Sequence, residues 1–483
     1  MKYAYDIKGQ LLKSIDPYDR DISVNHYTTA GQMLRTDHID RGTQKIAMDA
    51  LGLPVITTDA KGARTLTSYD ELQRPTHVRA RDKSSDATTL RQILQYGDNA
   101  GITNPQNQNL KGQLYIHNDE AGRLTYTEYD FKGNNLNFYR QLINDNAISA
   151  YQKYVVDWDN FPSSHLSNTP NTTTTEYDAL NRIRKLYYPK DRANQRKVLE
   201  PTYNKGGALY SVKLGGTDYV DEIGYNARGQ RILLSMGNGV MTRYTYDLDT
   251  FRLLRTKSEK FNFSGHTYTP SGGTQQDLQY FYDLEGTIIE QNDHAPANTS
   301  AQGPGGLTRQ FAHDPLRRLI SATGRESSNV YQQPSWDLNV RPQDYTNTNN
   351  YIRAFSYDKL GNIQELDHKA TGHSNQDFVR NYGYSGDFNN NWLKQFSYGS
   401  NTYGYQYDAN GNITKEGDNR YFQWTQNDKP ATYSNQAGPS DPTVYTNYFY
   451  NAAGERVKKH TRKGQQIEVT VYIPACILRI TQA

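Results

Sequence analysis

Aromatic and polar residues alternate in short runs along this chain, and one run returns many times with small changes. It is most complete in Phe355-Ser356-Tyr357-Asp358-Lys359-Leu360-Gly361-Asn362-Ile363, and nearly the same pattern returns from Tyr405 to Ile413 and from Tyr3 to Leu11. Side chains at positions i and i+2 of a β-strand point to the same face of the sheet. The pattern aromatic-x-Tyr-Asp-x-x-Gly-polar-apolar therefore predicts the end of one strand, a turn, and the start of the next strand.

The Asp-x-x-Gly segment in the middle of the pattern predicts the turn itself. Asp begins a type I turn, and the Gly three residues later supplies the positive φ that closes it. A polar and an apolar residue then open the returning strand, so each run encodes a β-hairpin. The residues that we expect to build these turns, taken from five clear instances, are Tyr5, Asp6, Gly9, Tyr129, Asp130, Gly133, Tyr282, Asp283, Gly286, Tyr357, Asp358, Gly361, Tyr407, Asp408 and Gly411.

Variants of the run support the same interpretation. Asn181 occupies the glycine position after Tyr177-Asp178, and Asn is the other residue that tolerates the left-handed conformation. Asn204 and Asn226 replace the turn Asp, and an Asn side chain can make the same bond to the backbone. Gln73 stands in the glycine position after Tyr69-Asp70, where only the front half of the pattern is kept.

The hairpin runs cover nearly the whole chain, at spacings that leave room for one short strand between turns. Loop-rich insertions interrupt them near 135–175, 264–275, 295–307 and 327–350, and the first of these predicts a short helix near 147–151. None of these stretches is long enough for a separate domain. We expect one all-β domain over residues 1–483, a continuous antiparallel hairpin spiral that forms a shell or part of one.

Composition agrees with a thin sheet rather than a packed globule. The chain has 40 Tyr among 483 residues, but it is only 35% hydrophobic and its mean hydropathy is −0.90. Tyr is a strand former with an apolar ring and a polar hydroxyl. Such a chain cannot fill a thick aliphatic core, but it can cover a single-layer sheet whose two faces are both partly polar.

Charge and cysteine content exclude several classes of partner and site. Lys and Arg (54) nearly balance Asp and Glu (51), and the short basic run 456–460 is a solvated strand face, so no nucleic-acid partner is expected. The single Cys476 excludes an internal disulfide framework and suits a bacterial protein that is secreted or held at the cell surface. No apolar run approaches the ~20 residues of a membrane span. Because Met1 leads directly into a repeat, we expect either a fragment or export without a cleaved leader.

Catalytic, metal and cofactor sites are not expected anywhere in the chain. The repeated Asp residues come one per hairpin, whereas paired catalysis needs two carboxylates ~5–10 Å apart in one cleft. Asp247-Leu248-Asp249 resembles a metal-binding Asp-x-Asp only over three letters, and the pair His368 and His373 has no third ligand nearby. Cys476 and His460 could suggest a thiol nucleophile, but an apolar terminal strand favours a buried or incidental thiol. The Tyr residues could stack on sugars, although their regular placement favours packing between rungs.

The recurring Tyr-Asp-x-x-Gly-polar-(Leu/Ile) pattern resembles the Rhs/YD-repeat family, whose repeats wind into a hollow β-shell. The run Glu128 to Asn134 is similar to repeats of the C-type component of insecticidal toxin complexes. The closing stretch Tyr472 to Arg479 resembles that component's Tyr-Leu-Pro-Gly-x-Glu-x-Arg strand, with Ala475 and Ile477 in place of Gly and Glu. Members of the family continue with a self-cleaving Asp-Pro-x-Gly-type segment and a toxin. We identify neither segment within residues 1–483, so the resemblance assigns the self-cleaving activity to no residue of this chain.

The resemblance implies a non-enzymatic shell segment that encapsulates a toxic polypeptide in a secreted bacterial delivery assembly. It also implies a partner, either a B-type toxin-complex component or missing repeats that complete the shell. Repeats of this type occur in cell-surface and wall-associated proteins as well. Adhesion or glycan binding is therefore the alternative function.

Sheet area limits what the chain can enclose by itself. If about 60% of residues lie in strands, at ~16 Å² each, the sheet covers ~4,600 Å², which is a sphere of ~19 Å radius. Inward side chains leave a space of ~14 Å radius. A compact 100-residue domain has an outer radius of ~17 Å. We therefore expect the chain to be part of a larger shell.

Overall fold

The computed structural model describes residues 1–191, 193–265, 267–295, 308–328, 348–384, 390–436, 442–473 and 476–482. Its strands form one sheet of 36 strands, in which each strand pairs antiparallel with the next one in the chain. The all-β antiparallel fold is confirmed, and 59% of the chain lies in strands, as the sheet-area argument assumed. Among the described residues, helix is limited to α1 (Asp145–Ser149) and to short 3₁₀ turns at Pro105–Gln108, Trp158–Asn160, Ser163–His165 and Ser374–Gln376.

The bounds of the strands show how evenly the hairpins follow one another. They are β1 Lys2–Tyr5, β2 Leu11–Ile15, β3 Asp21–Tyr27, β4 Met33–His38, β5 Gly42–Met48, β6 Pro54–Thr58, β7 Arg64–Tyr69, β8 Pro75–Arg81, β9 Thr89–Tyr96, β10 Leu114–Asp119, β11 Gly122–Tyr129, β12 Asn135–Leu142, β13 Asn171–Tyr177, β14 Ile183–Lys190, β15 Arg196–Tyr203, β16 Leu209–Leu214, β17 Thr217–Tyr225 and β18 Arg231–Met236. They continue with β19 Val240–Tyr246, β20 Leu253–Ser264, β21 Thr267–Tyr282, β22 Ile288–Asp293, β23 Arg309–His313, β24 Leu319–Ser327, β25 Thr348–Tyr357, β26 Ile363–Ala370, β27 Phe378–Tyr384, β28 Leu393–Tyr398, β29 Asn401–Tyr407, β30 Ile413–Glu416, β31 Arg420–Trp424, β32 Pro430–Ser434, β33 Val444–Tyr450, β34 Arg456–Lys463, β35 Gln466–Ile473 and β36 Cys476–Gln482.

Most repeat turns share one set of hydrogen bonds, and the turn at Asp358 shows them clearly. The Asp358 N–H donates to the Asn362 carbonyl at 3.0 Å, and the Gly361 N–H donates to the Asp358 carbonyl at 3.2 Å. The carboxylate Oδ1 of Asp358 accepts the N–H groups of Leu360 and Asn362, both at 2.8 Å. Gly361 has φ 93°, in the left-handed region that favours glycine. The side chain of Asp358 therefore holds the backbone of its own turn.

A tyrosine at the end of many strands, just before the turn, joins its hairpin to an earlier one. Its hydroxyl donates to a backbone carbonyl, in most hairpins that of a residue about 15 to 20 positions earlier in the chain. The pairs are Tyr27 with Leu11, Tyr69 with Pro54, Tyr96 with Pro75, Tyr129 with Leu114, Tyr203 with Ile183, Tyr225 with Leu209, Tyr246 with Arg231, Tyr282 with Leu253, Tyr357 with Leu319, Tyr384 with Ile363 and Tyr407 with Leu393. A tyrosine ring can thus lie on the sheet while its hydroxyl stays satisfied.

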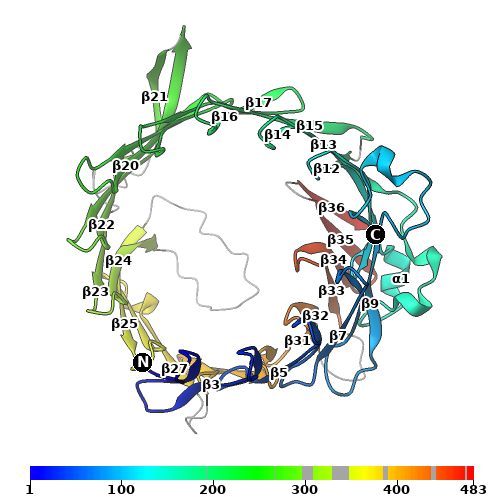
Figure 1. Ribbon diagram of the computed structural model, residues 1–483. Helices are drawn as coiled ribbons and strands as arrows, with labels where there is room; N and C mark the ends of the chain where they lie inside the picture. Colours follow the sequence, from blue (N-terminus) through cyan, green and yellow to red (C-terminus); the bar gives the residue numbers. More distant parts are fainter. Residues whose placement is uncertain are drawn as a thin grey trace.

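The sheet curves around one axis and overlaps itself (Figure 1). The first strands, drawn in blue, share one sector of the ring with the last ones, drawn in yellow, orange and red. Two hydrogen bonds across this overlap, from Asn391 to Asp40 and from Asn410 to Asp59, each join residues 351 positions apart. About 351 residues therefore make one turn of the spiral, and the chain makes somewhat more than one turn.

The connection between β12 and β13 contributes to an apolar core cluster within the described residues. We call residues 143–170 the strap. Its buried side chains, with those of β9, β12 and β33–β35, form the cluster Leu90, Ala121, Leu142, Ile143, Ala147, Ile148, Val156, Trp158, Leu166, Phe449, Val457, Val469 and Val471. The strap lies on the outer side of the ring in Figure 1. It holds the last strands against the first turn by burying apolar surface.

The expected insertions differ from the structure in their extent. Residues 135–142 are strand β12, so the first insertion is the strap alone, with its helix at Asp145–Ser149. The stretch 264–275 lies in a long hairpin of β20 and β21 that projects from the ring in Figure 1, because its Thr, Tyr and Phe residues continue the ladder. Residues 296–307 and 329–347, which cover most of the other two expected insertions, lie outside the described residues.

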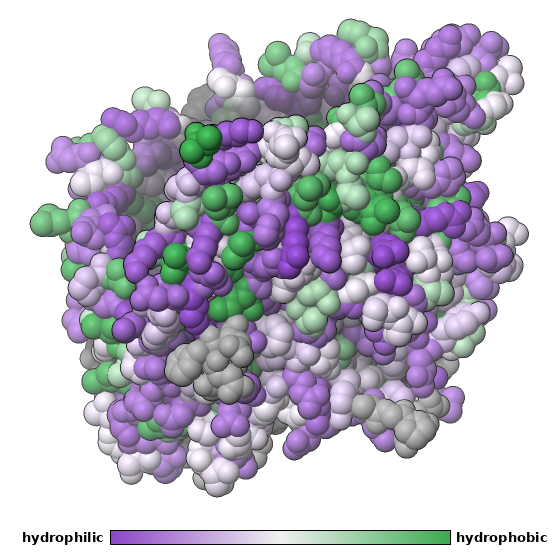
Figure 2. Space-filling model, turned by 60° about the horizontal axis from the view of Figure 1, so that its bottom comes forward, coloured by the Kyte–Doolittle hydropathy of each residue, from purple (hydrophilic) through white to green (hydrophobic). Residues whose placement is uncertain are grey.

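Apolar and polar side chains are mixed on the surface, as the composition predicts. Figure 2 shows apolar residues scattered among polar ones on this face. Within the described ranges, no helix is long and apolar enough to cross a membrane. The interpretation of residues 1–483 as a single domain stays a prediction.

Candidate functional site: the seam between the turns of the spiral

The spiral overlaps itself, so that hairpins of its first turn lie next to hairpins of its second turn. The line along which these hairpins meet is called the seam. The turn between β4 and β5 faces the turn between β27 and β28, and the turn between β6 and β7 faces the one between β29 and β30. Successive hairpin loops alternate between the two edges of the sheet. Because an odd number of strands separates the facing hairpins, their loops lie on opposite edges and meet directly. The seam therefore brings together side chains that the repeat pattern places at solvent-exposed turns.

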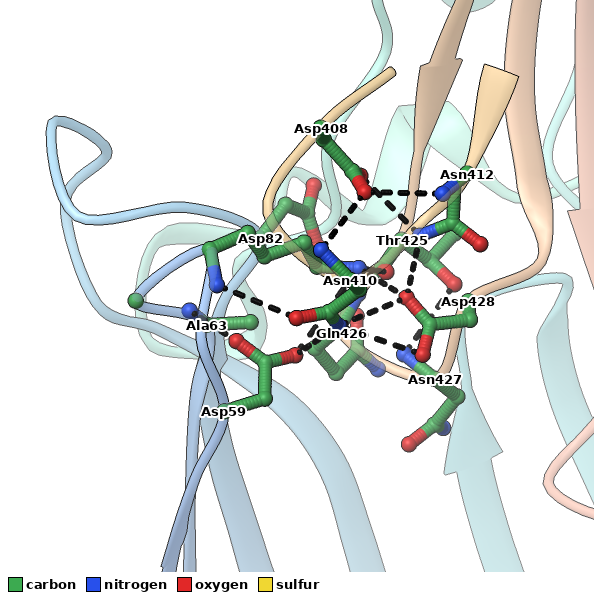
Figure 3. Close-up of polar contacts among 12 residues, drawn as sticks. Asp59, Ala63, Asp82, Asp408, Asn410, Asn412, Thr425, Gln426, Asn427 and Asp428 are labelled. Carbon is green, nitrogen blue, oxygen red and sulfur yellow. Dashed lines mark hydrogen bonds and ion pairs between the residues drawn. The ribbon is translucent and has the colours of Figure 1, made fainter. Parts of the chain in front are cut away.

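Asn410 lies at the centre of the seam and is 7% exposed (Figure 3). Its Nδ2 donates to Asp59 Oδ2 at 2.7 Å and to Asp428 Oδ1 at 3.0 Å. Its Oδ1 accepts the backbone N–H of Lys61 at 3.1 Å, and its own N–H caps Asp408 Oδ1 at 2.9 Å. One amide side chain thus joins a first-turn hairpin to two hairpins of the second turn.

Lys61 adds a charged contact beside Asn410. Its Nζ donates to Asp428 Oδ1 at 2.5 Å and to the Thr425 carbonyl at 2.7 Å, with only 6% of its side chain exposed. Burial would raise the pKa of Asp428, but the hydrogen bonds from Lys61 and two Asn side chains lower it. Burial raises the pKa of Asp59 against the opposing effects of Asn410 and Lys61. The pKa values of Asp59 and Asp428, which both accept hydrogen bonds from Asn410, are therefore shifted in opposite directions.

Asp40 forms a second junction of the seam. Its Oδ1 accepts the Asn391 N–H at 2.6 Å, and its Oδ2 accepts Asn391 Nδ2 at 3.0 Å. The indole Nε1 of Trp392 donates to the Asp40 carbonyl at 3.0 Å. Arg20 Nη2 completes this junction by donating to Asn391 Oδ1 at 2.8 Å.

A buried ionic cluster forms the third junction. Asp82 is 2% exposed and accepts Lys153 Nζ at 2.6 Å, with Arg91 Nη2 at 3.3 Å. Gln426 of the second turn donates its N–H to Asp82 at 3.0 Å and its Nε2 to Glu120 at 2.8 Å. Burial would raise the pKa of Asp82, but the positive charges of Arg91 and Lys153 lower it. Burial raises the pKa of Glu120 although Arg91 lies beside it.

These junctions share one arrangement. Carboxylates of first-turn hairpins accept hydrogen bonds from amide groups of second-turn hairpins, and the carboxylates are Asp40, Asp59, Asp82 and Glu120. Hydrogen bonds to a charged group are worth roughly twice as much as neutral ones. The seam is therefore a closure made of polar contacts, supported by the apolar cluster of the strap.

Backbone packing at the seam is tight as well. A Cβ added at Gly411 would lie 2.7 Å from the Asp40 carbonyl and 2.9 Å from Trp392 Nε1. A Cβ at Gly42 would lie 2.4 Å from the Ala60 Cβ. By contrast, a Cβ at Gly9 meets nothing within 4 Å. Glycine favours the turn conformation at most repeats, and at Gly411 it also allows the close approach of another hairpin.

The turn residues expected from the sequence occupy two settings. The turn of Tyr407, Asp408 and Gly411 lies in the seam. The other four named turns build hairpins elsewhere, with Asp6, Asp130, Asp283 and Asp358 each accepting backbone N–H groups of their own turns. Sequence reasoning passed over the seam residues Asn410, Asp59 and Gln426. Their only signal was an amide or carboxylate at a turn tip, which is also what a solvated turn looks like.

Asp247 and His368, two other candidates for chemistry, have structural partners. Asp247 Oδ1 accepts the N–H groups of Asp249 and Thr250, as a turn cap does. His368 is fully buried, with Nε2 2.8 Å from Glu326 Oε1. In the parts of the chain that the structure describes, no group of three or more His, Cys, Asp or Glu could hold a metal ion. The Cys476 side chain lies outside the described residues.

The spiral of hairpins and the Tyr-Asp turns define the class of fold, which is a YD-repeat β-shell. Comparison with known proteins confirms the resemblance to the C-type components of toxin complexes. The chain is 26% identical to toxin subunit YenC1 of Yersinia entomophaga over 491 residues, covering 95% of this chain and 47% of the relative. It is 25% identical to toxin subunit YenC2 of the same organism, covering 98% of this chain and 51% of the relative. The chain thus spans about half the length of the curated relatives it matches.

Solved structures show the same fold. The crystal structure of TcdB2-TccC3-Cdc42 matches with a TM-score of 0.84 and 24% identity, over all of this chain and 23% of that one. The Tc holotoxin pore of Photorhabdus luminescens with the mutation TccC3-D651A matches with a TM-score of 0.85 and 24% identity, over all of this chain and 22% of that one. No protein-family model matches the sequence.

Proposed function

We propose that this chain is a non-enzymatic wall segment of a shell that encloses a toxic polypeptide within a secreted bacterial toxin-delivery assembly. The observation that carries the proposal is the similarity to toxin subunits over 95% or more of the chain, together with the same curved fold. The repeated Asp and Tyr side chains bond within turns and between hairpins, and Asn410 and Gln426 bond across the seam, which supports a structural role. In this role the seam closes the wall where the spiral overlaps itself.

A partner polypeptide completes the wall in this proposal. Strand β1 pairs only with β2 among the described strands, and its residues Tyr3 and Tyr5 are 56% and 60% exposed. Tyr5 also differs from the repeat tyrosines that donate to an earlier hairpin, since it has no hydrogen-bond acceptor within the described residues. An exposed sheet edge is a template for another strand. A B-type component or further repeats would supply that strand and the missing acceptor.

Protease protection tests enclosure directly. The chain is expressed with an unstructured reporter polypeptide fused after residue 483, with and without a B-type component, and is then exposed to a nonspecific protease. We expect the reporter to resist cleavage only when the B-type component is present. A reporter cut equally fast in both preparations would contradict enclosure.

One observation favours adhesion as a second candidate. The outer part of the β20–β21 hairpin carries the aromatic residues Phe261, Phe263 and Tyr268, with ring centroids 5.2 and 4.7 Å apart, and Phe263 is 54% exposed. Exposed aromatic rings beside uncharged polar residues suit the faces of sugars. Binding on a glycan array that disappears when residues 261–274 are replaced by a short turn would favour adhesion. Absence of binding by the intact chain would exclude it for the glycans on that array.

A further inference from the structure

Basic side chains alternate along β34 beneath the strap. Lys458, His460 and Arg462 occupy every second position of this strand, so they share one face. Lys458 and His460 are each 3% exposed. The strap contributes one carboxylate to this face, that of Asp145, whose Oδ1 lies 2.5 Å from Lys458 Nζ. The Oγ of Ser149 lies 3.3 Å from His460 Nε2.

Among the described residues, the register partners of His460 on the two neighbouring strands are uncharged. Its partner on β33 is Asn447, and its partner on β35 is Val469. Asn447 uses its Oδ1 to accept the N–H of Tyr154 from the strap at 3.2 Å. The charged groups that act on His460 are therefore Asp145, Lys458 and Arg462. The neutral imidazole lies among two positive charges and one negative charge.

We propose that His460 makes the strap an acid-sensitive latch, so that protonation of its imidazole loosens residues 143–170 from β33–β35 below about pH 6, close to the ordinary titration range of histidine. The imidazolium would add a positive charge to a buried face that already carries Lys458, beside the carboxylate that Asp145 of the strap supplies. It would also be desolvated by the strap that covers it. This latch concerns the wall itself, so it does not depend on what the shell encloses.

The direction of the pH effect follows from burial. Burial lowers the pKa of His460, and the nearby charge of Lys458 lowers it further, against an opposing effect of Asp145. The loosened state, in which the imidazole is hydrated, binds the proton at the ordinary pKa of about 6.5. Because the loosened state binds more protons, the closed strap is fully stable above that pH and loses stability as the pH falls through it.

Loosening the strap would have consequences for the seam. The strap buries Ile148 and Trp158 in the cluster that holds β33–β35, and Lys458 donates to the Ile143 carbonyl at 2.6 Å. Without these contacts the last strands lose the strap's part of the apolar cluster, while their ladder bonds and the junction at Gln426 remain. Acid would therefore open the wall first at its last strands.

Hydrogen exchange read by mass spectrometry tests the latch on the whole chain. Exchange of peptides from residues 143–170 is measured between pH 7.5 and 5.0, corrected for the intrinsic pH dependence of exchange, with peptides from β17–β19 as an internal reference. We expect protection of the strap to fall at least tenfold between pH 7.5 and 5.0 in the wild type, while the reference stays protected. Unchanged strap protection over this range would overturn the proposal without any variant.

Three variants separate charge from packing. His460→Gln stays neutral and should keep the strap protected at pH 5.0. Ser149→Ala removes the hydroxyl contact but no charge, so it should keep the wild-type pH dependence. Asp145→Asn removes the compensating carboxylate and should move the loss of protection to higher pH. Wild-type pH dependence in His460→Gln would overturn the assignment to His460.

Discussion

The hydroxyl of Tyr357 donates a hydrogen bond to the backbone carbonyl of Leu319 at 2.7 Å, across 38 positions of the sequence. Residues 329–347, the longest undescribed stretch, lie between Leu319 and Tyr357 in the sequence. Strands β24 and β25 on either side of this stretch pair directly, so the bond still joins neighbouring hairpins. The same tyrosine-to-carbonyl bond recurs along the described sheet. It explains why the chain uses so much Tyr where Phe would supply an equal ring.

Removing this hydroxyl should weaken the fold modestly. Tyr357→Phe keeps the ring and leaves the Leu319 carbonyl without its side-chain donor, so we expect a loss of about 1 kcal/mol in the free energy of unfolding. Tyr5→Phe is the matched control, because the Tyr5 hydroxyl has no partner within the described residues, and it should change stability by less than about 0.5 kcal/mol. Urea unfolding of the two variants measures both effects. Equal losses would contradict the role of the hydroxyl.

The turn carboxylate should matter through its acceptor oxygen rather than its charge. Asp358→Ala leaves the N–H groups of Leu360 and Asn362 without their side-chain acceptor, and we expect a loss of about 1–2 kcal/mol. Asp358→Asn keeps one acceptor oxygen in the same place, as Asn226 does in its own turn at 3.0 Å, and should lose less than half as much. Thermal unfolding at neutral pH compares them. A variant with Asn as unstable as the variant with Ala would show that charge dominates.

Two glycines with nearly the same φ should respond differently to a methyl group. Gly9 and Gly411 have φ 80° and 85°. Gly9→Ala carries only the strain of a positive φ, about 1 kcal/mol. Gly411→Ala carries that strain and also a clash with the Asp40 carbonyl and Trp392 in the seam, so we expect at least about 2 kcal/mol more. Chemical denaturation measures the loss of unfolding free energy in both variants. Equal losses would mean that Gly411 is not closely packed against Asp40 and Trp392.

The buried cluster at Asp82 predicts a defined acid dependence. Because its pKa is lowered in the folded chain, Asp82 contributes stability above its ordinary pKa of about 3.9 and loses that contribution as the pH falls through the lowered value. Asp82→Asn leaves Arg91 and Lys153 poorly compensated and should cost about 3 kcal/mol at pH 7. The difference between variant and wild type should shrink below about pH 4. A difference that is independent of pH would contradict this assignment.

The repeat turns could be predicted from the sequence because each one is local. Tyr, Asp and Gly within five positions fix a strand end, a cap and a positive φ, and Asn181 takes the same conformation at φ 62°. Gln73 and Arg317 also do so, at φ 64° and 63°, since the surrounding ladder and the turn Asp hold the backbone there. The strands and the turn Asp thus impose a positive φ at this position even where the residue is not glycine.

The seam could not be predicted in the same way. Whether Asn410 meets Asp59 depends on the circumference of the spiral, which arises from the twist and bulges accumulated over 351 residues. The sequence predicts the strap as an insertion with a short helix, but its apolar contacts with β33–β35 depend on the same closure. Long-range register of this kind leaves no local signal in a single sequence.

We propose that this chain is one segment of a wall that a B-type component or further repeats complete. Sedimentation velocity of the chain alone, and of the chain mixed with a B-type component, decides whether it needs such a partner. We expect self-association of the isolated chain through its open strand edges and a discrete one-to-one complex with the partner. A soluble, stable monomer with a sealed cavity that ignores the B-type component would contradict it.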